Sequence, residues 1–231
     1  MSANFEQKLF PPDIAMSLSF AIGRFTAAAR IYGEHRVLTE SKFQKAREIR
    51  VTSAFLLGLS TITGKTYWVQ PEYKENTPDI YGISFSRHPK YQDGNVRDIL
   101  SIELKEYESH SKEDLLSFIK GKLSNKHLPA HYILLVHGNR PDELVNTEEV
   151  FTELSKEELR LGDVWLLANI KDDSGDKFVV VSLYRTRSGN FFHLEEEIKK
   201  NSKCTPFIRA SRGKGTSPVV GVLRIPFPED R

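Results

Sequence analysis

The chain has 231 residues, of which 39% are hydrophobic and 28% are charged, and a chain of this size buries a full core as one domain. No stretch approaches the roughly eighteen apolar residues that cross a bilayer, and the first residues lack the pattern of a secretory signal. The single cysteine, Cys204, excludes an internal disulfide framework. We therefore expect a cytoplasmic protein with no membrane partner.

The net charge of +2 is unevenly distributed along the chain. Residues 199–231 hold eight Lys or Arg and two acids, a net charge of +6, so the rest of the chain carries −4. Within this region Arg209, Arg212 and Lys214 lie among glycines, which allow close approach of a backbone to phosphate oxygens. We predict that these three cations bind nucleic acid. A solvated loop is the alternative.

The first quarter of the sequence predicts two helices. Residues 13–32 are rich in Ala, Leu and Phe, and Asp13 is the expected N-cap. A second helix is expected at about 40–62, where apolar residues recur near helical spacing and Gly64 follows the end.

Strand-like segments dominate the middle of the sequence. Three of them are expected at 66–70, 79–86 and 98–106, separated by segments rich in Pro, Asn, Asp and Gly. A helix starting near Ser111 and Asp114 and ending near 124 comes next. Residues 131–137 are almost wholly apolar, which is typical of a central strand covered on both faces. The strand–helix–strand order predicts a parallel pair, and therefore a mixed sheet.

The last third of the chain adds further elements to this sheet. The pattern predicts a helix, a strand hairpin, a short helix and a final strand, at 143–159, 164–170 with 178–185, 194–200 and 219–225. The expected fold class is therefore α/β, with a central mixed β-sheet flanked by helices and with C-terminal β additions.

A candidate metal site lies on two of the predicted strands. Side chains alternate along a strand, so Glu103 and Lys105 share one face while Leu104 points to the other. Asp79 opens the preceding strand directly after Pro78. If these strands pair as an antiparallel hairpin, the two carboxylates lie near one edge. Two carboxylates, a backbone carbonyl and waters form the oxygen octahedron that Mg²⁺ prefers.

These residues resemble the motif of the PD-(D/E)xK superfamily of restriction-endonuclease-like nucleases. Pro78-Asp79 matches its first part, and Glu103-Leu104-Lys105 matches its second, within a helix–strand–strand–strand–helix–strand order. The resemblance implies a restriction-endonuclease-like fold. It divides the single domain into an N-terminal helical extension (1–39), a nuclease-like core (40–137) and a region of helix, hairpin and basic C-terminus (138–231).

The resemblance also implies roles for the residues of the motif. Asp79 and Glu103 would hold Mg²⁺ or Mn²⁺, and Lys105 would assist the attacking water. Many family members add a glutamate from the helix before the first strand, for which Glu48 is the first choice and Glu40 the second. The implied function is a metal-dependent endonuclease that cleaves DNA in restriction or repair, and a palindromic target would suit a homodimer.

Two other interpretations stay open. The chain could be a catalytically decayed nuclease fold that binds nucleic acid or a protein partner. Glu103 and Lys105 could also be the outward polar face of an antiparallel sheet in a protein-interaction domain. A phosphate-binding loop is not expected at Gly58–Thr66, because five residues separate its glycines and a helix precedes it.

Overall fold

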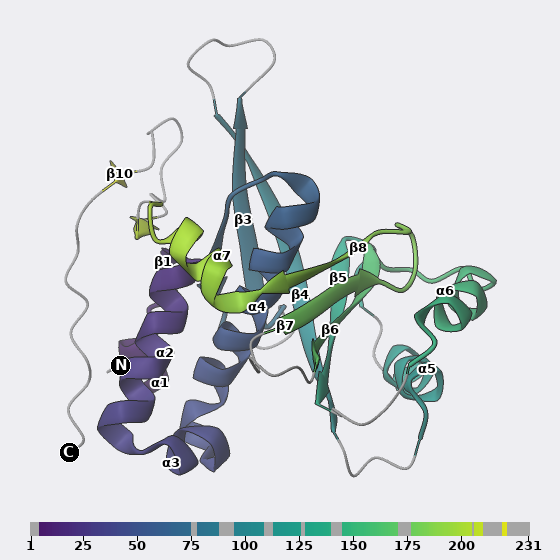
Figure 1. The fold of residues 1–231 in the computed structure, drawn as a ribbon, viewed down its shortest axis with the longest axis horizontal. Coiled ribbons are helices and arrows are strands. Elements are labelled where there is room, and N and C mark those ends of the chain that lie inside the picture. The colour runs from purple at the N-terminus through teal and green to yellow at the C-terminus, as the bar shows by residue number, and fades with distance from the viewer. Residues whose placement is uncertain are drawn as a thin grey trace.

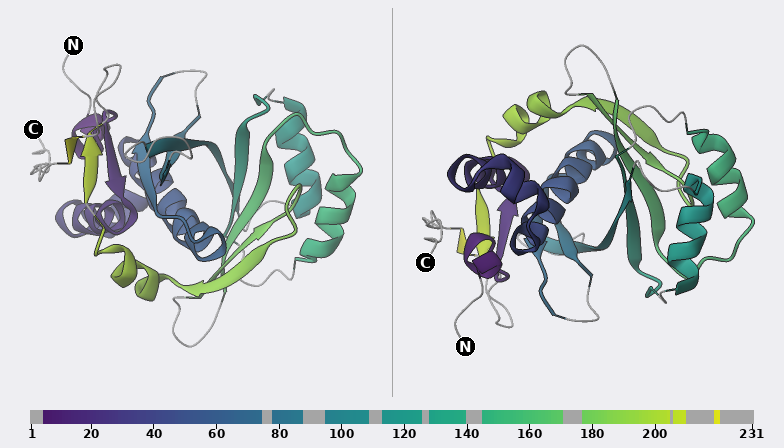
Figure 2. Two further views of the ribbon diagram at one scale, coloured as in Figure 1. Left: turned by 90° about the horizontal axis from the view of Figure 1, so that it is seen from above. Right: turned by 90° about the horizontal axis from the view of Figure 1, so that it is seen from below.

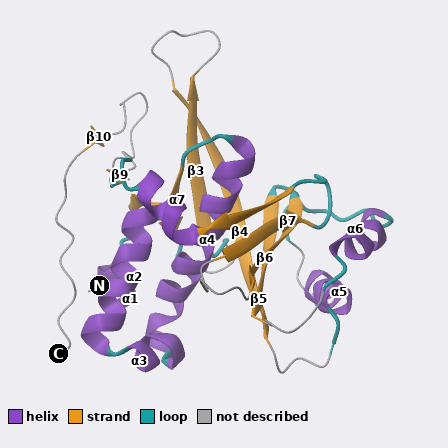
Figure 3. Cartoon of the chain, in the orientation of Figure 1, coloured by secondary structure: helices purple, strands orange, loops and turns teal. Residues whose placement is uncertain are grey.

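Ten strands and seven α-helices make up the described part of the chain (Figures 1 and 3). The computed structural model describes residues 5–74, 78–87, 95–108, 113–125, 128–139, 145–170, 177–204, 206–209 and 219–220. The helices are α1 (Phe5–Leu9), α2 (Leu18–Tyr32), α3 (Glu34–Thr39), α4 (Gln44–Thr63), α5 (Leu115–Asn125), α6 (Thr147–Ser155) and α7 (Leu194–Asn201), and a 3₁₀ turn (Ser41–Phe43) precedes α4. The strands are β1 (Ile14–Ser17), β2 (Tyr67–Pro71), β3 (Ile80–Arg87), β4 (Asn95–Glu108), β5 (Tyr132–Asn139), β6 (Asp163–Ile170), β7 (Lys177–Ser182), β8 (Gly189–His193), β9 (Phe207–Arg209) and β10 (Val219–Val220).

All ten strands belong to one sheet, in the order β10-β9-β1-β2-β3-β4-β5-β6-β7-β8. Strands β4, β5 and β6 run parallel to one another, and the other neighbours are antiparallel. The predicted mixed sheet of an α/β protein is therefore confirmed. The parallel pairing of β4 with β5, in which Glu103 faces Leu134, is confirmed as well.

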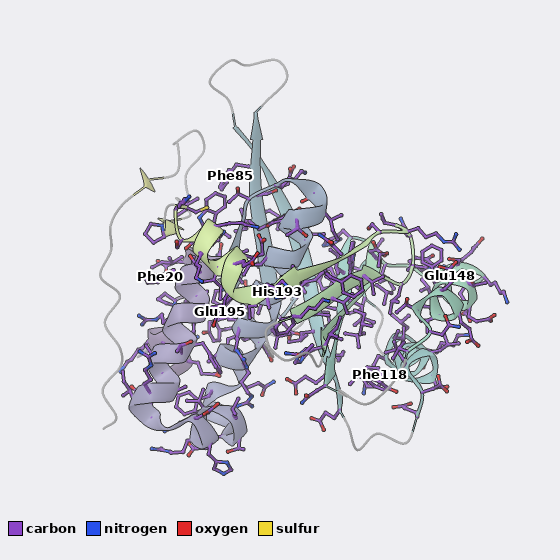
Figure 4. The ribbon with its side chains drawn as sticks, viewed as in Figure 1. Phe20, Phe85, Phe118, Glu148, His193 and Glu195 are labelled. Atoms are coloured by element: carbon purple, nitrogen blue, oxygen red, sulfur yellow. The ribbon has the colours of Figure 1, made fainter. Side chains whose placement is uncertain are left out.

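Helices cover both faces of the sheet (Figure 2). Helices α2, α4 and α7 lie on one face, where Phe55 and Leu56 of α4 share a buried core with Ile102 and Leu104 of β4. Helices α5 and α6 cover the other face, and Figure 4 labels Phe118 on α5. The Phe118 ring packs on Tyr107 of β4, with ring centroids 5.1 Å apart. Strand β4 is therefore covered on both sides, and its alternating side chains enter different environments. None of the helices among the described residues is long and apolar enough to span a membrane.

The prediction of one helix from 13 to 32 is wrong at its start. All four residues of β1 are buried, and the strand pairs with β2 on one side and β9 on the other. Helix α2 begins only at Leu18, and the Ser17 hydroxyl, rather than Asp13, accepts a hydrogen bond from the Phe20 N–H. Pairing with distant strands therefore overrides the local helical pattern here.

The second predicted helix is confirmed as α4. It ends at Gly64, whose φ of 67° lies in the left-handed region that glycine adopts most easily. The three predicted strands are confirmed as β2, β3 and β4, and the later hairpin as β6 and β7. Asp114 caps α5 through the Ser117 N–H, whereas Ser111 lies outside the described residues. Strand β8 was not predicted.

Residues 5–39 contribute to the central sheet and its covering layer. Strand β1 is an integral member of the sheet, and α2 packs directly against α4. The hydrophobic core on this face includes Leu18 and Phe25 of α2 together with residues of α4, β4 and β6. Residues 5–39, within the segment predicted as an N-terminal helical extension, therefore include a strand of the sheet and share its hydrophobic core.

Candidate active site

Asp79 lies just before β3 and reaches across to β4. Its Oδ2 atom accepts a hydrogen bond from the Leu104 N–H at 2.9 Å. The last backbone pair of these strands is Ile80 with Ile102, so the Asp79 carboxylate extends the pairing beyond the end of the strand. This contact holds Asp79 beside the strand segment that carries Glu103.

Glu103 and Lys105 form an ion pair on one face of β4. Lys105 Nζ lies 2.8 Å from Glu103 Oε1 and donates to the Leu104 carbonyl at 3.1 Å. The Glu103 side chain is 2% exposed and that of Lys105 is 30% exposed. Their shared face confirms the predicted alternation, with Leu104 packed into the core on the opposite side.

The two candidate helical glutamates lie in different surroundings. Glu48 of α4 is 14% exposed; its Oε2 lies 2.6 Å from Lys45 Nζ, and its Oε1 accepts a hydrogen bond from the Gln44 amide at 2.9 Å. Glu40 is 38% exposed and pairs with Arg36 at the end of α3. Of these two residues, Glu48 is the one whose negative charge raises the pKa of Asp79.

The carboxylates of the site interact electrostatically. Burial raises the pKa of Asp79, and the negative charges of Glu48 and Glu103 raise it further. The Leu104 N–H and the Lys105 ammonium group act in the opposite direction. Asp79, Glu48, Glu103 and Lys105, all predicted from the sequence, are thus brought into one neighbourhood.

The same neighbourhood is not arranged as a finished set of metal ligands. Among the described residues, no group of three or more His, Cys, Asp or Glu side chains is placed to hold a metal ion. Asp79 is bonded to a backbone N–H, Glu103 to Lys105, and Glu48 to Lys45 and Gln44. The oxygens have the chemistry that Mg²⁺ prefers, but lysines and amides contact them in this structure.

A cleft of about 320 Å³ opens beside Asp79, and it contains residues that the sequence did not single out. Its walls are formed by Glu6, Gln44, Lys45, Glu48, Glu72, Tyr73, Lys74, Pro78 and Asp79. The hydroxyl of the half-buried Tyr73 donates to the carbonyls of Glu6 and Phe10, at 3.0 and 2.8 Å. Burial raises the pKa of Tyr73. In the sequence, the only sign of a role for Lys45 is its position three residues before Glu48, on the same face of the predicted helix.

A second cavity, of about 450 Å³, lies on the α4 face near the carboxyl ends of the parallel strands. Its polar wall includes Arg47 and Arg50 of α4, Glu106 of β4 and His137 of β5. Side chains alternate along β4, so Glu106 lies on the same side of the sheet as Leu104, which packs in the core beneath α4. The cavity therefore borders this side of β4 and not the side that carries Glu103. Burial, together with the Arg50 charge, lowers the pKa of His137 to about 4.

His137 should make the protein less stable in acid. Its pKa in the folded chain, about 4, is below the roughly 6.5 of an unfolded histidine, so stability falls as the pH drops from 6.5 towards 4. A difference of one pH unit between the folded and unfolded pKa values is worth about 1.4 kcal/mol, so the full loss is up to about 3 kcal/mol. We expect His137→Gln to reduce this loss, as measured by urea unfolding between pH 7 and 4. The exposed His131→Gln is the control, and equal pH profiles for wild type and His137→Gln would contradict the expectation.

The predicted nucleic-acid contacts lie mostly outside the described residues. Arg212 and Lys214 are among the residues that the structure does not describe, and for Arg209 only the backbone, at the end of β9, is described. Arg209 pairs with Ile14 of β1, and β1 and β2 lie between β9 and β3 in the sheet. The proposed basic contacts therefore stay a prediction.

No protein-family model, curated protein or solved structure matches this chain.

Proposed function

We propose that this protein is a metal-dependent phosphodiesterase that cleaves DNA as an endonuclease, with a restriction-endonuclease-like fold of the PD-(D/E)xK type. The observation that carries the proposal is the hydrogen bond from the Leu104 N–H to Asp79 Oδ2 at 2.9 Å. It brings the carboxylate that follows Pro78 to the strand segment bearing Glu103 and Lys105. The two halves of the motif, 24 residues apart in the sequence, therefore meet at one point of the sheet.

The residues fit a magnesium or manganese ion by their chemistry. Asp79 and Glu103 supply hard oxygen ligands, and the raised pKa of Asp79 reflects burial and repulsion that a divalent cation would offset. A bound ion would stabilise charge on a phosphate and lower the pKa of a water molecule. Lys105 is partly exposed beside Glu103, where its ammonium group could orient that water or offset phosphate charge.

Plasmid cleavage tests the proposal. We expect the wild type to nick or linearise plasmid DNA with Mg²⁺ or Mn²⁺, and Asp79→Ala and Lys105→Ala to lose this activity. Lys65→Ala is the matched control. Lys65 is 49% exposed and pairs with Asp98, which lies on β4 like Glu103 and Lys105 but away from the motif. Cleavage that is absent from the wild type, or that survives both motif substitutions, contradicts the proposal.

A second candidate function is a decayed nuclease fold that binds nucleic acid or a protein partner. The contacts of Lys105 with Glu103 and of Lys45 with Glu48 favour it, because these carboxylates are neutralised without a metal. DNA binding that weakens with salt, without cleavage under any metal, would support this alternative.

For the enzyme, cleavage of both strands of a palindrome would fit a homodimer, which sedimentation of the protein–DNA complex would reveal.

A further inference from the structure

Lys45 occupies a central place beside the candidate active site. Its ammonium group lies 2.6 Å from Glu48 Oε2, donates to the carbonyl of Asp79 at 3.1 Å, and lies 5.7 Å from the ring centroid of Tyr73. The Lys45 side chain is only 12% exposed. Its backbone N–H donates to Glu6 Oε1 at 2.7 Å, which fixes the start of the side chain as well.

The position of Lys45 in its helix is unfavourable without these partners. It is the second residue of α4, and the first turn of a helix repels positive charge because its N–H groups point outward. A nearly buried ammonium group also loses hydration, which must be replaced by close oxygen atoms. Glu48 and the Asp79 carbonyl supply these oxygens and form a binding site for the Lys45 ammonium group. Through these contacts Lys45 links α4 to Asp79, the residue directly before β3.

We propose that Lys45 is the resident cation of this site, a positioning residue that neutralises Glu48 and holds the Asp79 backbone. In this arrangement Glu48 forms an ion pair with Lys45 and does not bind the metal. A single divalent ion binds at Asp79 and Glu103. The inference rests on the proposed metal-dependent function. It replaces the role that the family resemblance implies for Glu48.

Lys45 should therefore limit how strongly the site attracts a divalent ion. The positive charge of Lys45, which is held 3.1 Å from the Asp79 carbonyl, repels the ion. Its removal leaves the Glu48 carboxylate without its lysine partner. Unit charges at such distances near a protein surface change a binding constant by about tenfold or more. We expect Lys45→Met to bind Mn²⁺ at least about tenfold more tightly than the wild type, or to bind a second ion.

Calorimetric titration of the metal-free full chain with Mn²⁺ tests this inference. The wild type should bind one ion, Lys45→Met should bind more strongly, and Lys45→Met with Glu48→Gln should return to wild-type affinity. Glu48→Gln alone should weaken Mn²⁺ binding by about tenfold, because the Lys45 charge then lacks its carboxylate partner. Lys42→Met is the control, since Lys42 pairs with Glu40 and lies outside the cleft.

The outcomes separate this inference from the proposed function. A loss of Mn²⁺ affinity of about a hundredfold or more on Glu48→Gln, both in the wild type and in Lys45→Met, would make Glu48 a ligand and overturn the inference, while the proposed metal site would stand. An absence of Mn²⁺ binding in every variant would overturn the proposed function. Thermal unfolding without metal tests Lys45 independently: Lys45→Met should lower the midpoint, and adding Glu48→Gln should restore part of it. An unchanged midpoint in Lys45→Met would contradict the role assigned to Lys45.

Discussion

Glu103→Gln is expected to abolish metal-dependent DNA cleavage, with a loss of about a thousandfold or more, because a bound metal contributes several kcal/mol of charge stabilisation. Glutamine keeps the size of the side chain but removes the negative charge that we propose binds the ion. Cleavage rates on supercoiled plasmid at saturating Mn²⁺, together with Mn²⁺ titration of each variant, measure the effect.

The same substitution should leave the fold intact. Glu103 is nearly fully buried, so its replacement by a neutral isostere removes the cost of burying a charge as well as its ion pair. Lys105 keeps its bond to the Leu104 carbonyl and its partial exposure. We expect the free energy of unfolding to change by about 1 kcal/mol or less. Glu106→Gln, on the other face of β4, is the matched control, and full cleavage by Glu103→Gln would refute the assigned role.

Gly58→Ala should destabilise the protein, although alanine normally favours a helix over glycine by about 1 kcal/mol. A Cβ atom at Gly58 would stand 2.5 Å from Cε1 of Phe192 and 2.8 Å from Cγ1 of Val180. Both of those side chains are buried in the core. Overpacking of this kind costs about 1–3 kcal/mol, which exceeds the gain in helix propensity. Urea unfolding of the variant measures the net change.

Gly23→Ala provides the matched control on a neighbouring helix. Gly23 lies within α2, and a Cβ atom there would meet nothing within 4 Å. We therefore expect Gly23→Ala to stabilise the protein by about 0.5–1 kcal/mol. Opposite signs for the two substitutions would establish that α4 fits tightly against β7 and β8. Stabilisation by Gly58→Ala would contradict the close packing of Gly58.

Local pattern was sufficient to predict the centre of the sheet and the site residues on it. Strand β4 alternates apolar and polar residues over Leu100–Lys105, which is enough to assign Glu103 and Lys105 to one face. The apolar run of β5 was enough to predict its central position, and the strand–helix–strand order was enough to predict its parallel pairing with β4. The link from Asp79 to Leu104 required only that β3 and β4 pair as a hairpin, which neighbouring strands commonly do.

Other features depend on contacts between distant parts of the chain. Strand β1 forms because β2 and β9 bind its two edges, and neither edge is visible in residues 13–17. The role of Lys45 depends on how α4 approaches Asp79, 34 residues later in the sequence. The sequence of β8 lacks the alternation of apolar and polar residues that marks a strand, because Phe191 and Phe192 are neighbours and both apolar. In the structure Phe191 is exposed, and Phe192 is buried next to Val180 and Gly58. Tertiary packing decides each of these cases.

The pairing of β1 with β9 also has a consequence for synthesis of the chain on the ribosome. Strand β1 is made well before β9, the strand that completes its second edge and ends at Arg209. The contacts of Ser17 with Pro206 and of Ser19 with Asn201 close the same junction. Until β9 has been made, β1 therefore presents an open sheet edge, which is a template for aggregation.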